Sequence, residues 1–183
     1  TSSDEALAGV WRTNMSENTK IDQYVENLAN THQMCATLLK TPHYAKMGME
    51  GVFTIIQTAK SLGIDPMIAL AGGLYYFHGK VEMSARQMNA IIRSRGHSIT
   101  VDNKSDDKIC IVHGKRKDTG DTCACKFTIE EARRIGLTKN PTWLNYPEDM
   151  LFARAISRLG RRLFPDLIGN CYVEGEIDDD KLK

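Results

Sequence analysis

The sequence predicts an α+β fold: N-terminal helices, a small antiparallel sheet with an embedded helix, and a long basic C-terminal helix packed on the sheet. Three observations lead to this prediction. Helix-period segments come first, short segments broken by turn residues occupy the middle, and a long amphipathic segment follows residue 147. Helices and strands that are segregated in this way are typical of α+β domains.

The N-terminal part contains three predicted helices. Apolar residues recur at three- and four-residue steps over Glu17–Lys40, which predicts an amphipathic helix that ends before Pro42. A second helix is expected over Met49–Leu62, where Gly63 supplies the C-terminal stop. Asp65-Pro66 has the pattern of an N-cap followed by proline in the first turn, and it opens a short third helix.

The middle of the chain has strand patterns interrupted by one helix. Two short strands flank a tight turn at His78-Gly79, and Ser84-Ala85-Arg86-Gln87 reads as a capping box that begins the embedded helix. Three further strands are expected at His97–Asn103, Lys108–Gly114 and Thr122–Thr128.

Helices return after the last strand. Thr128-Ile129-Glu130-Glu131 is a second capping box, and a long helix is expected from Pro147 or Glu148 to Phe164, ended by Pro165. No repeat or long linker divides the chain, so we expect one domain over residues 1–183. Its parts are the N-terminal helices (about 17–71), a strand-rich core (about 73–128), the C-terminal helices (about 129–165) and an acidic tail (174–183).

Composition narrows the functional classes. The chain has 42% hydrophobic and 26% charged residues, which is typical of a globular domain. Its most apolar stretch, Met67–Phe77, is far shorter than the roughly 20 residues of a membrane span, so we expect no membrane partner. The five cysteines lack a CxxC pair, and the N-terminus lacks a signal-peptide pattern; both features favour reduced thiols and a cytoplasmic location.

Charge is distributed unevenly along the chain although the net charge is only +1. Residues 76–162 carry 17 Lys and Arg against 10 Asp and Glu, whereas the remaining residues carry 7 against 13. A basic middle between acidic ends favours a polyanion partner such as a nucleic acid.

The most informative feature is a row of arginines on the final helix. Four of them follow i, i+4, i+7 and i+8 spacing, which confines them to an arc of about 100°; they are Arg154, Arg158, Arg161 and Arg162. Apolar residues occupy a neighbouring arc, so the helix is expected to pack on the sheet while it presents the arginines to phosphates. The alternative is that acidic residues elsewhere in the chain neutralise this row, for instance Asp102, Asp106 or Asp178–Asp180 of the tail.

Further candidate DNA contacts lie outside that helix. The basic ones are Lys115, Arg116 and Lys117 on the hairpin and Arg86, Arg93 and Arg95 on the embedded helix. Each cluster alone is more often a solvated surface, but together they could line one groove. Trp143, Tyr75 and Tyr76 are candidates for stacking on bases, with core packing as the more common role of such residues.

Other chemistry has little support in the sequence. There is no GxxxxGK[ST] loop that would bind ATP. A metal-dependent nuclease needs clustered carboxylates, but Asp102, Asp106 and Asp107 fall in a polar turn. The residue types of Cys110, His113, Cys123 and Cys125 suit zinc, but strand alternation places Cys110 and His113 on opposite faces. We therefore expect no cofactor, no structural zinc and no catalytic residue.

Three motifs resemble the phage RecT/Redβ superfamily of single-strand annealing proteins. Ser61-Leu62-Gly63-Ile64-Asp65-Pro66, followed by a strand-turn-strand, resembles the family's GL(N/D)P segment, and Thr128–Leu137 resembles its T(I/L)E(D/E)A(K/R)RAGL segment. Trp143, Pro147 and Met150-Leu151 match the W-x-x-x-P-x-x-M-L run that opens the family's DNA-facing helix. The resemblance covers roughly residues 51–172. It departs at Glu148 and Asp149, where well-known members carry basic residues.

The resemblance implies ATP-independent annealing of complementary single strands in phage-type recombination, inside a bacterial host cell. It also implies a homo-oligomer, as a ring or helical filament, and partners such as a phage exonuclease or a host single-strand binding protein. Arg154 and Arg161 occupy positions that are basic and contact DNA in the family. Two other hypotheses remain: a metal-dependent DNA-end nuclease, and an adaptor domain that binds duplex DNA or a protein.

Overall fold

The computed structural model describes residues 22–77, 79–169 and 171–173, and these fall into two compact units. One unit ends at Phe53 and the other begins at Thr54, so the boundary lies within α3 (Gly48–Leu62). This division is finer than the single domain expected from the sequence. The acidic tail at 174–183 lies outside the described residues.

The first unit is helical. A helix covers residues 22–38, and α2 (Pro42–Ala45) follows with proline in its first turn. Cys35 and Thr31 are buried, and the Thr31 hydroxyl donates to the carbonyl of Asn27. Tyr24 is one of the regularly spaced apolar residues of the predicted Glu17–Lys40 helix, but its side chain is exposed. The predicted start of this helix, residues 17–21, lies outside the described part of the chain.

The second unit contains two three-stranded sheets rather than the single sheet that was predicted. In the first, β1 (Leu74–Phe77) pairs antiparallel with β2 (Lys80–Met83), and β2 pairs parallel with β6 (Tyr172–Val173). The sequence prediction missed β6 because a two-residue strand has no periodicity to detect.

The larger sheet is antiparallel, as predicted. Its order is β3 (Ser98–Val101), β4 (Ile109–Lys115) and β5 (Thr122–Thr128), so that β3 and β5 form its edges. The embedded helix is α5 (Ala85–Ser94), which connects the two sheets in the chain. The hydroxyl of Ser84 accepts a hydrogen bond from the backbone N–H of Gln87, as expected for the N-cap of α5.

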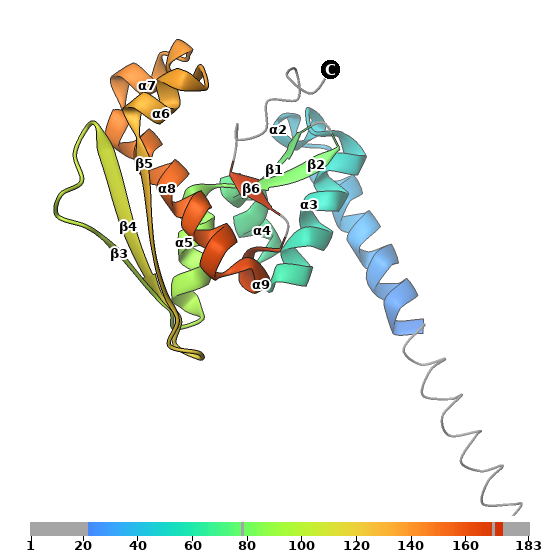
Figure 1. Cartoon of the computed structure of the whole chain (residues 1–183). Coiled ribbons are helices and arrows are strands. Elements are labelled where there is room, and N and C mark those ends of the chain that lie inside the picture. Colours follow the sequence, from blue (N-terminus) through green and yellow to red (C-terminus); the bar gives the residue numbers. More distant parts are fainter. Residues whose placement is uncertain (1–21, 78, 170, 174–183) are drawn as a thin grey trace, which may run out of the picture. The chain divides into compact units, whose positions relative to one another are not determined.

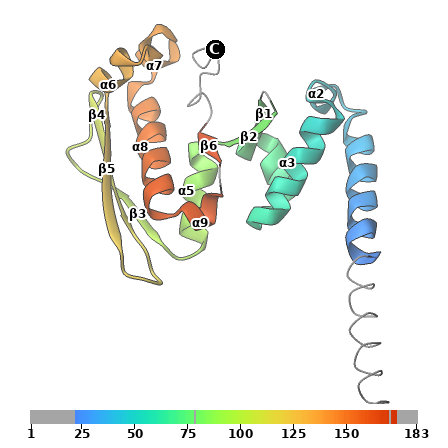
Figure 2. The same ribbon diagram turned by 45° about the vertical axis from the view of Figure 1, so that its right-hand side comes forward.

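The long C-terminal helix α8 (Pro147–Leu163) lies along β4 and β5, with α5 beside it (Figures 1 and 2). Its buried face includes Leu151, Ile156 and Leu159, which confirms the predicted packing of this helix on the sheet. Gly114 of β4 permits a close approach, because a Cβ there would lie 2.8 Å from Leu163 Cδ2. The predicted α+β class is therefore confirmed.

Short helices complete the second unit: α4 (Pro66–Ile68), the π-helical turn η1 (Ala69–Gly73), α6 (Ile129–Arg134), the 3-10 turn η2 (Leu137–Lys139), α7 (Thr142–Asn145) and α9 (Pro165–Ile168). The capping box that begins α6 is complete, as predicted. The carboxylate of Asp65 caps α4 by accepting from the N–H groups of Met67 and Ile68. Among the residues described, no helix is both long and apolar enough to cross a membrane.

Candidate nucleic-acid interface

The arginine row of α8 does not form one exposed cationic surface. Arg154 is only 7% exposed, and Arg161 is partly exposed. Arg162, in the last turn, is exposed. All four arginines do lie on one helix, as their spacing predicted. Arg154, the first of them, is nevertheless covered by other parts of the second unit. The expectation that all four arginines face solvent is wrong.

Arg158 is held by neighbours from β5 and α6. Its guanidinium donates to the carbonyl of Lys126 and, at 3.3 Å, to the carboxylate of Glu131. It also lies over the ring of Phe127, 4.9 Å from the ring centroid. The same Glu131 caps α6 by accepting from the N–H of Thr128. Arg158 therefore ties α8 to β5 and α6. Internal neutralisation was the alternative expected from the sequence, but the carboxylate that pairs with Arg158 is Glu131 and not one of the aspartates named there.

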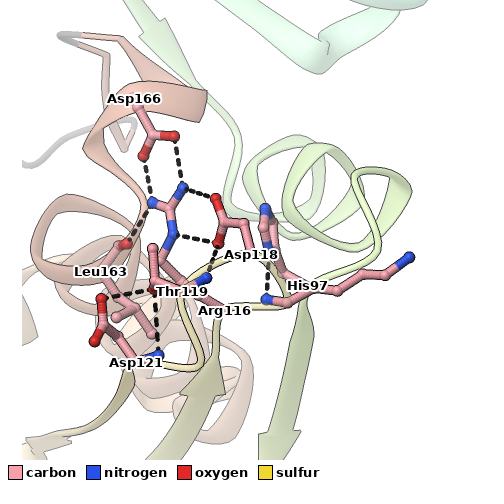
Figure 3. A network of polar contacts seen from close by, with 8 residues as sticks. His97, Arg116, Asp118, Thr119, Asp121, Leu163 and Asp166 are labelled. Atoms are coloured by element: carbon pink, nitrogen blue, oxygen red, sulfur yellow. Dashed lines mark hydrogen bonds and ion pairs between the residues drawn. The ribbon is translucent and has the colours of Figure 1, made fainter.

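The three basic residues of the hairpin differ in their surroundings: Arg116 is paired with carboxylates, whereas Lys115 and Lys117 are exposed. Figure 3 shows Arg116 between two carboxylates: Nε and Nη2 donate to Asp118, and both terminal nitrogens donate to Asp166. Nη1 also donates to the carbonyl of Leu163 at 3.0 Å. Hydrogen bonds from this guanidinium are the main reason that the pKa values of Asp118 and Asp166 are lowered.

Arg116 therefore joins the end of β4 to α9, and its expected role as a phosphate ligand is not supported by its surroundings. Lys115 and Lys117 on either side of it are exposed. The backbone N–H of Lys117 donates to Nδ1 of the buried His97 at 3.0 Å, which fixes the turn beside the C-terminal end of α5.

The arginines of α5 lie at both ends of that helix. Arg93 and Arg95 are exposed near the C-terminal end, where Arg93 donates to the carbonyl of Ile99 and Arg95 to that of Leu62. The side chain of Lys117 also reaches this end, because a Cβ on Gly96 would lie 3.2 Å from its Cδ. These side chains bring basic groups from the hairpin and from α5 together, as the sequence suggested.

Arg86 occupies the first turn of α5 and is exposed. It lines a cavity of about 750 Å³ in the second unit. The other lining residues are Ile68, Ala71, Gly72, Gly73, Tyr75, Ser84, Ala85, Gln87, Asn89, Asp149, Phe152 and Ala153. The wall thus combines the two aromatic rings of Tyr75 and Phe152, two side-chain amides, one cation, one carboxylate and further apolar side chains. Such a mixture of apolar wall and a few polar groups is typical of a ligand site.

A second, smaller cavity of about 270 Å³ shares Asp149 and Phe152 with the first and extends toward the β3–β4 loop. Glu148, Asp102 and Asp106 also line it. The Asp102 carboxylate accepts from the N–H of Lys104 and contacts His113 Nε2 at 2.8 Å, and these contacts lower its pKa. The acidic start of α8 noted in the sequence therefore faces these cavities.

Trp143 does not reach solvent. Its side chain is 2% exposed and its ring lies 6.2 Å, between centroids, from that of Phe127. The prediction that Trp143 contacts DNA is wrong, because α7 turns this ring into the core. Tyr75, by contrast, is half-buried and lines the larger cavity.

The four residues considered for zinc do not converge. Cys110 is buried, whereas His113 is exposed and bonded to Asp102. Cys123 and Cys125 lie closer, with their sulfurs 3.8 Å apart, and a guanidinium nitrogen of Arg162 lies 3.9 Å from Cys125. Within the described residues, no group of three or more His, Cys, Asp or Glu side chains is arranged to hold a metal ion. None of the five cysteines, which all lie within the described residues, takes part in a disulfide bond.

The sequence prediction missed the amides of the cavity, Gln87 and Asn89. Asn89 follows Arg86 by three residues on α5, so a search for polar residues one turn beyond each candidate arginine would have found it. Comparison of the chain with protein-family models and with curated proteins gave no match.

Proposed function

We propose that this chain binds single-stranded DNA and anneals complementary strands without ATP. The observation that carries the proposal is the larger cavity, in which Arg86, the first turn of α5 and Tyr75 lie around one opening. A helix N-terminus and a guanidinium both favour phosphate oxygens, and an aromatic ring stacks on any base.

The strand is held mainly through its backbone in this mechanism. Arg86 binds a phosphate at the cavity, and exposed cations at the other end of α5 and on the hairpin continue the contact; they are Arg93, Arg95, Lys115 and Lys117. Arg162 adds a further exposed guanidinium on α8. Because phosphate contacts carry no sequence information, most base edges stay free and pairing itself selects the second strand.

In this proposal the buried and paired arginines stabilise the fold and do not contact DNA. Arg154 lies within the fold, and Arg116 and Arg158 hold carboxylates of their own chain. They stiffen the helix and hairpin that carry the exposed cations. The proposal further includes assembly of the chain into a ring or helical filament in a bacterial cytoplasm, with a phage exonuclease or a host single-strand binding protein as partner.

The test mixes labelled complementary oligonucleotides with the protein, in the absence of ATP and with or without EDTA. We expect pairing to be faster than the spontaneous rate and unaffected by the chelator. The matched variants are Arg86→Ala and Arg133→Ala, because Arg133 is an exposed arginine on α6 that does not line the cavity. Only Arg86→Ala should slow annealing. Strand cleavage that EDTA stops would instead identify a nuclease, and binding restricted to duplex DNA would identify an adaptor.

A further inference from the structure

Two of the five cysteines lie in contact on one face of β5. Cys123 and Cys125 are two residues apart in this strand, so their side chains point to the same side of the sheet. Their sulfur atoms are 3.8 Å apart, close enough for one thiol to donate to the other. Arg162 of α8 donates to the Cys125 sulfur at 3.9 Å. The strand and the helix therefore bring two thiols and one guanidinium together.

The two thiols differ in their access to solvent. Cys123 is partly exposed, whereas Cys125 is only 3% exposed. Burial raises the pKa of the Cys125 thiol, and the hydrogen bond with Cys123 raises it further. Because the thiolate is the reactive form of cysteine, Cys125 is a poor first nucleophile. Cys123 is therefore the thiol that a reagent from solution meets first.

Arg162 prepares Cys125 for a second step. Burial and the neighbouring Cys123 raise the pKa of the Cys125 thiol, and the Arg162 guanidinium opposes them. Once Cys123 has joined a small molecule through a disulfide, its sulfur carries neither a proton nor a charge, so its effect on Cys125 disappears. Arg162 then favours the Cys125 thiolate beside the sulfur that this thiolate must attack.

The spacing along β5 permits an internal disulfide but strains it. Residues i and i+2 of a strand have Cα atoms about 6.7 Å apart, near the upper limit of about 6.8 Å for disulfides. β5 is an edge strand that pairs with β4 alone, so it can bend with the loss of fewer backbone hydrogen bonds than a central strand. Strained disulfides are reduced readily, which suits a reversible reaction.

The other three cysteines are less accessible than Cys123. Cys35, Cys110 and Cys171 are all buried. Burial also raises the pKa values of the Cys110 and Cys171 thiols. Thiol chemistry on the folded chain should therefore be confined to β5.

We propose that Cys123 and Cys125 form a thiol–disulfide exchange site that reacts with low-molecular-weight disulfides such as oxidised glutathione. The Cys123 thiolate attacks one sulfur of the small disulfide, so that a mixed disulfide forms and one small thiol leaves. The Cys125 thiolate then attacks the Cys123 sulfur and releases the second small thiol. Two protein thiols are thus oxidised to one disulfide, the small disulfide is reduced to two thiols, and the protons of the protein thiols pass through solvent to them.

The experiment treats the reduced, folded chain with oxidised glutathione and then counts the thiols that can be alkylated after unfolding. Peptide mass spectrometry locates any disulfide. We expect the parent chain to lose two of its five thiols, with Cys123 joined to Cys125, and to regain both in dithiothreitol.

Three variants separate the two steps. Cys110→Ala, at a buried position of the same sheet, should lose the same two thiols as the parent. Cys125→Ala should lose one thiol and keep glutathione bound at Cys123. Cys123→Ala should keep all its thiols over the same time, because Cys125 is shielded.

Two outcomes in the parent chain overturn the inference. Glutathione that stays on Cys123 without an internal disulfide would contradict the second step. Thiols that all remain unreacted, or that are lost as readily at the other three cysteines as on β5, would contradict the site itself. Both outcomes are read from the parent chain, so they hold even where a variant fails to fold. The assay contains no DNA, so its result is independent of the proposed annealing activity.

Discussion

Removal of the Arg158 side chain should destabilise the second unit far more than removal of Arg162, although both belong to the same arginine row. Arg158 and Glu131 have side chains that are only 28% and 29% exposed. A hydrogen bond from a charged group contributes about 1.5–3 kcal/mol. The contact with the Phe127 ring adds about 0.5–1 kcal/mol, and the partly exposed ion pair adds less than about 1 kcal/mol.

Because these contributions overlap, we expect Arg158→Ala to lower the free energy of unfolding by about 2–3 kcal/mol. Arg162→Ala should cost less than about 0.5 kcal/mol, because its side chain is exposed and its only described contact is a long one to the sulfur of Cys125. Urea unfolding followed by far-UV circular dichroism measures both. A variant lacking Arg158 that is as stable as the parent would refute the inference that Arg158 holds α8, β5 and α6 together.

Three other predictions test the corrected roles of individual residues. Trp143→Ala should lower the free energy of unfolding in urea by about 3–4 kcal/mol, because removal of a buried indole leaves a large cavity. The affinity of the folded variant for single-stranded DNA should equal that of the parent. A selective loss of affinity would instead support the role of Trp143 in stacking on bases. Arg116→Gln should lower the melting temperature most at neutral pH. The reason is that Arg116 lowers the pKa values of Asp118 and Asp166 in the folded state. The stabilisation from these two carboxylates is therefore complete above their unfolded-state pKa of about 3.9, and it is lost as the pH falls through their folded-state pKa values. A difference between parent and variant that stays constant down to about pH 2 would contradict this. Gly114→Ala should destabilise by about 1–3 kcal/mol through overpacking against Leu159 and Leu163, whereas Ala124→Val, at an exposed position opposite His113, should be tolerated in the same unfolding assay.

Local patterns in the sequence were sufficient to predict much of the fold. The helix expected from Pro147 or Glu148 to Phe164 is observed as Pro147–Leu163, and the Thr128 capping box begins α6 as predicted. These features are set by residues within one or two turns of each other, so spacing and cap chemistry determine them.

The surroundings of the candidate site could not be predicted in the same way. Arg158 bonds with Glu131, 27 residues earlier, and Arg116 bonds with Asp166, 50 residues later. Helical spacing gives the direction in which an arginine points, but it does not reveal which distant carboxylate or strand lies there. Trp143 shows the same limit, because the packing of its ring against Phe127 depends on how α7 folds back on β5.

The central claim is that Arg86, at the start of α5, holds a phosphate of single-stranded DNA. The most direct measurement is the slope of log affinity against log salt concentration for parent, Arg86→Ala and Arg133→Ala chains. Each lost phosphate contact should reduce the magnitude of this slope by about 0.7, so we expect that change for Arg86→Ala and the parent slope for Arg133→Ala. Parent-like slopes and affinities for both variants would contradict the account.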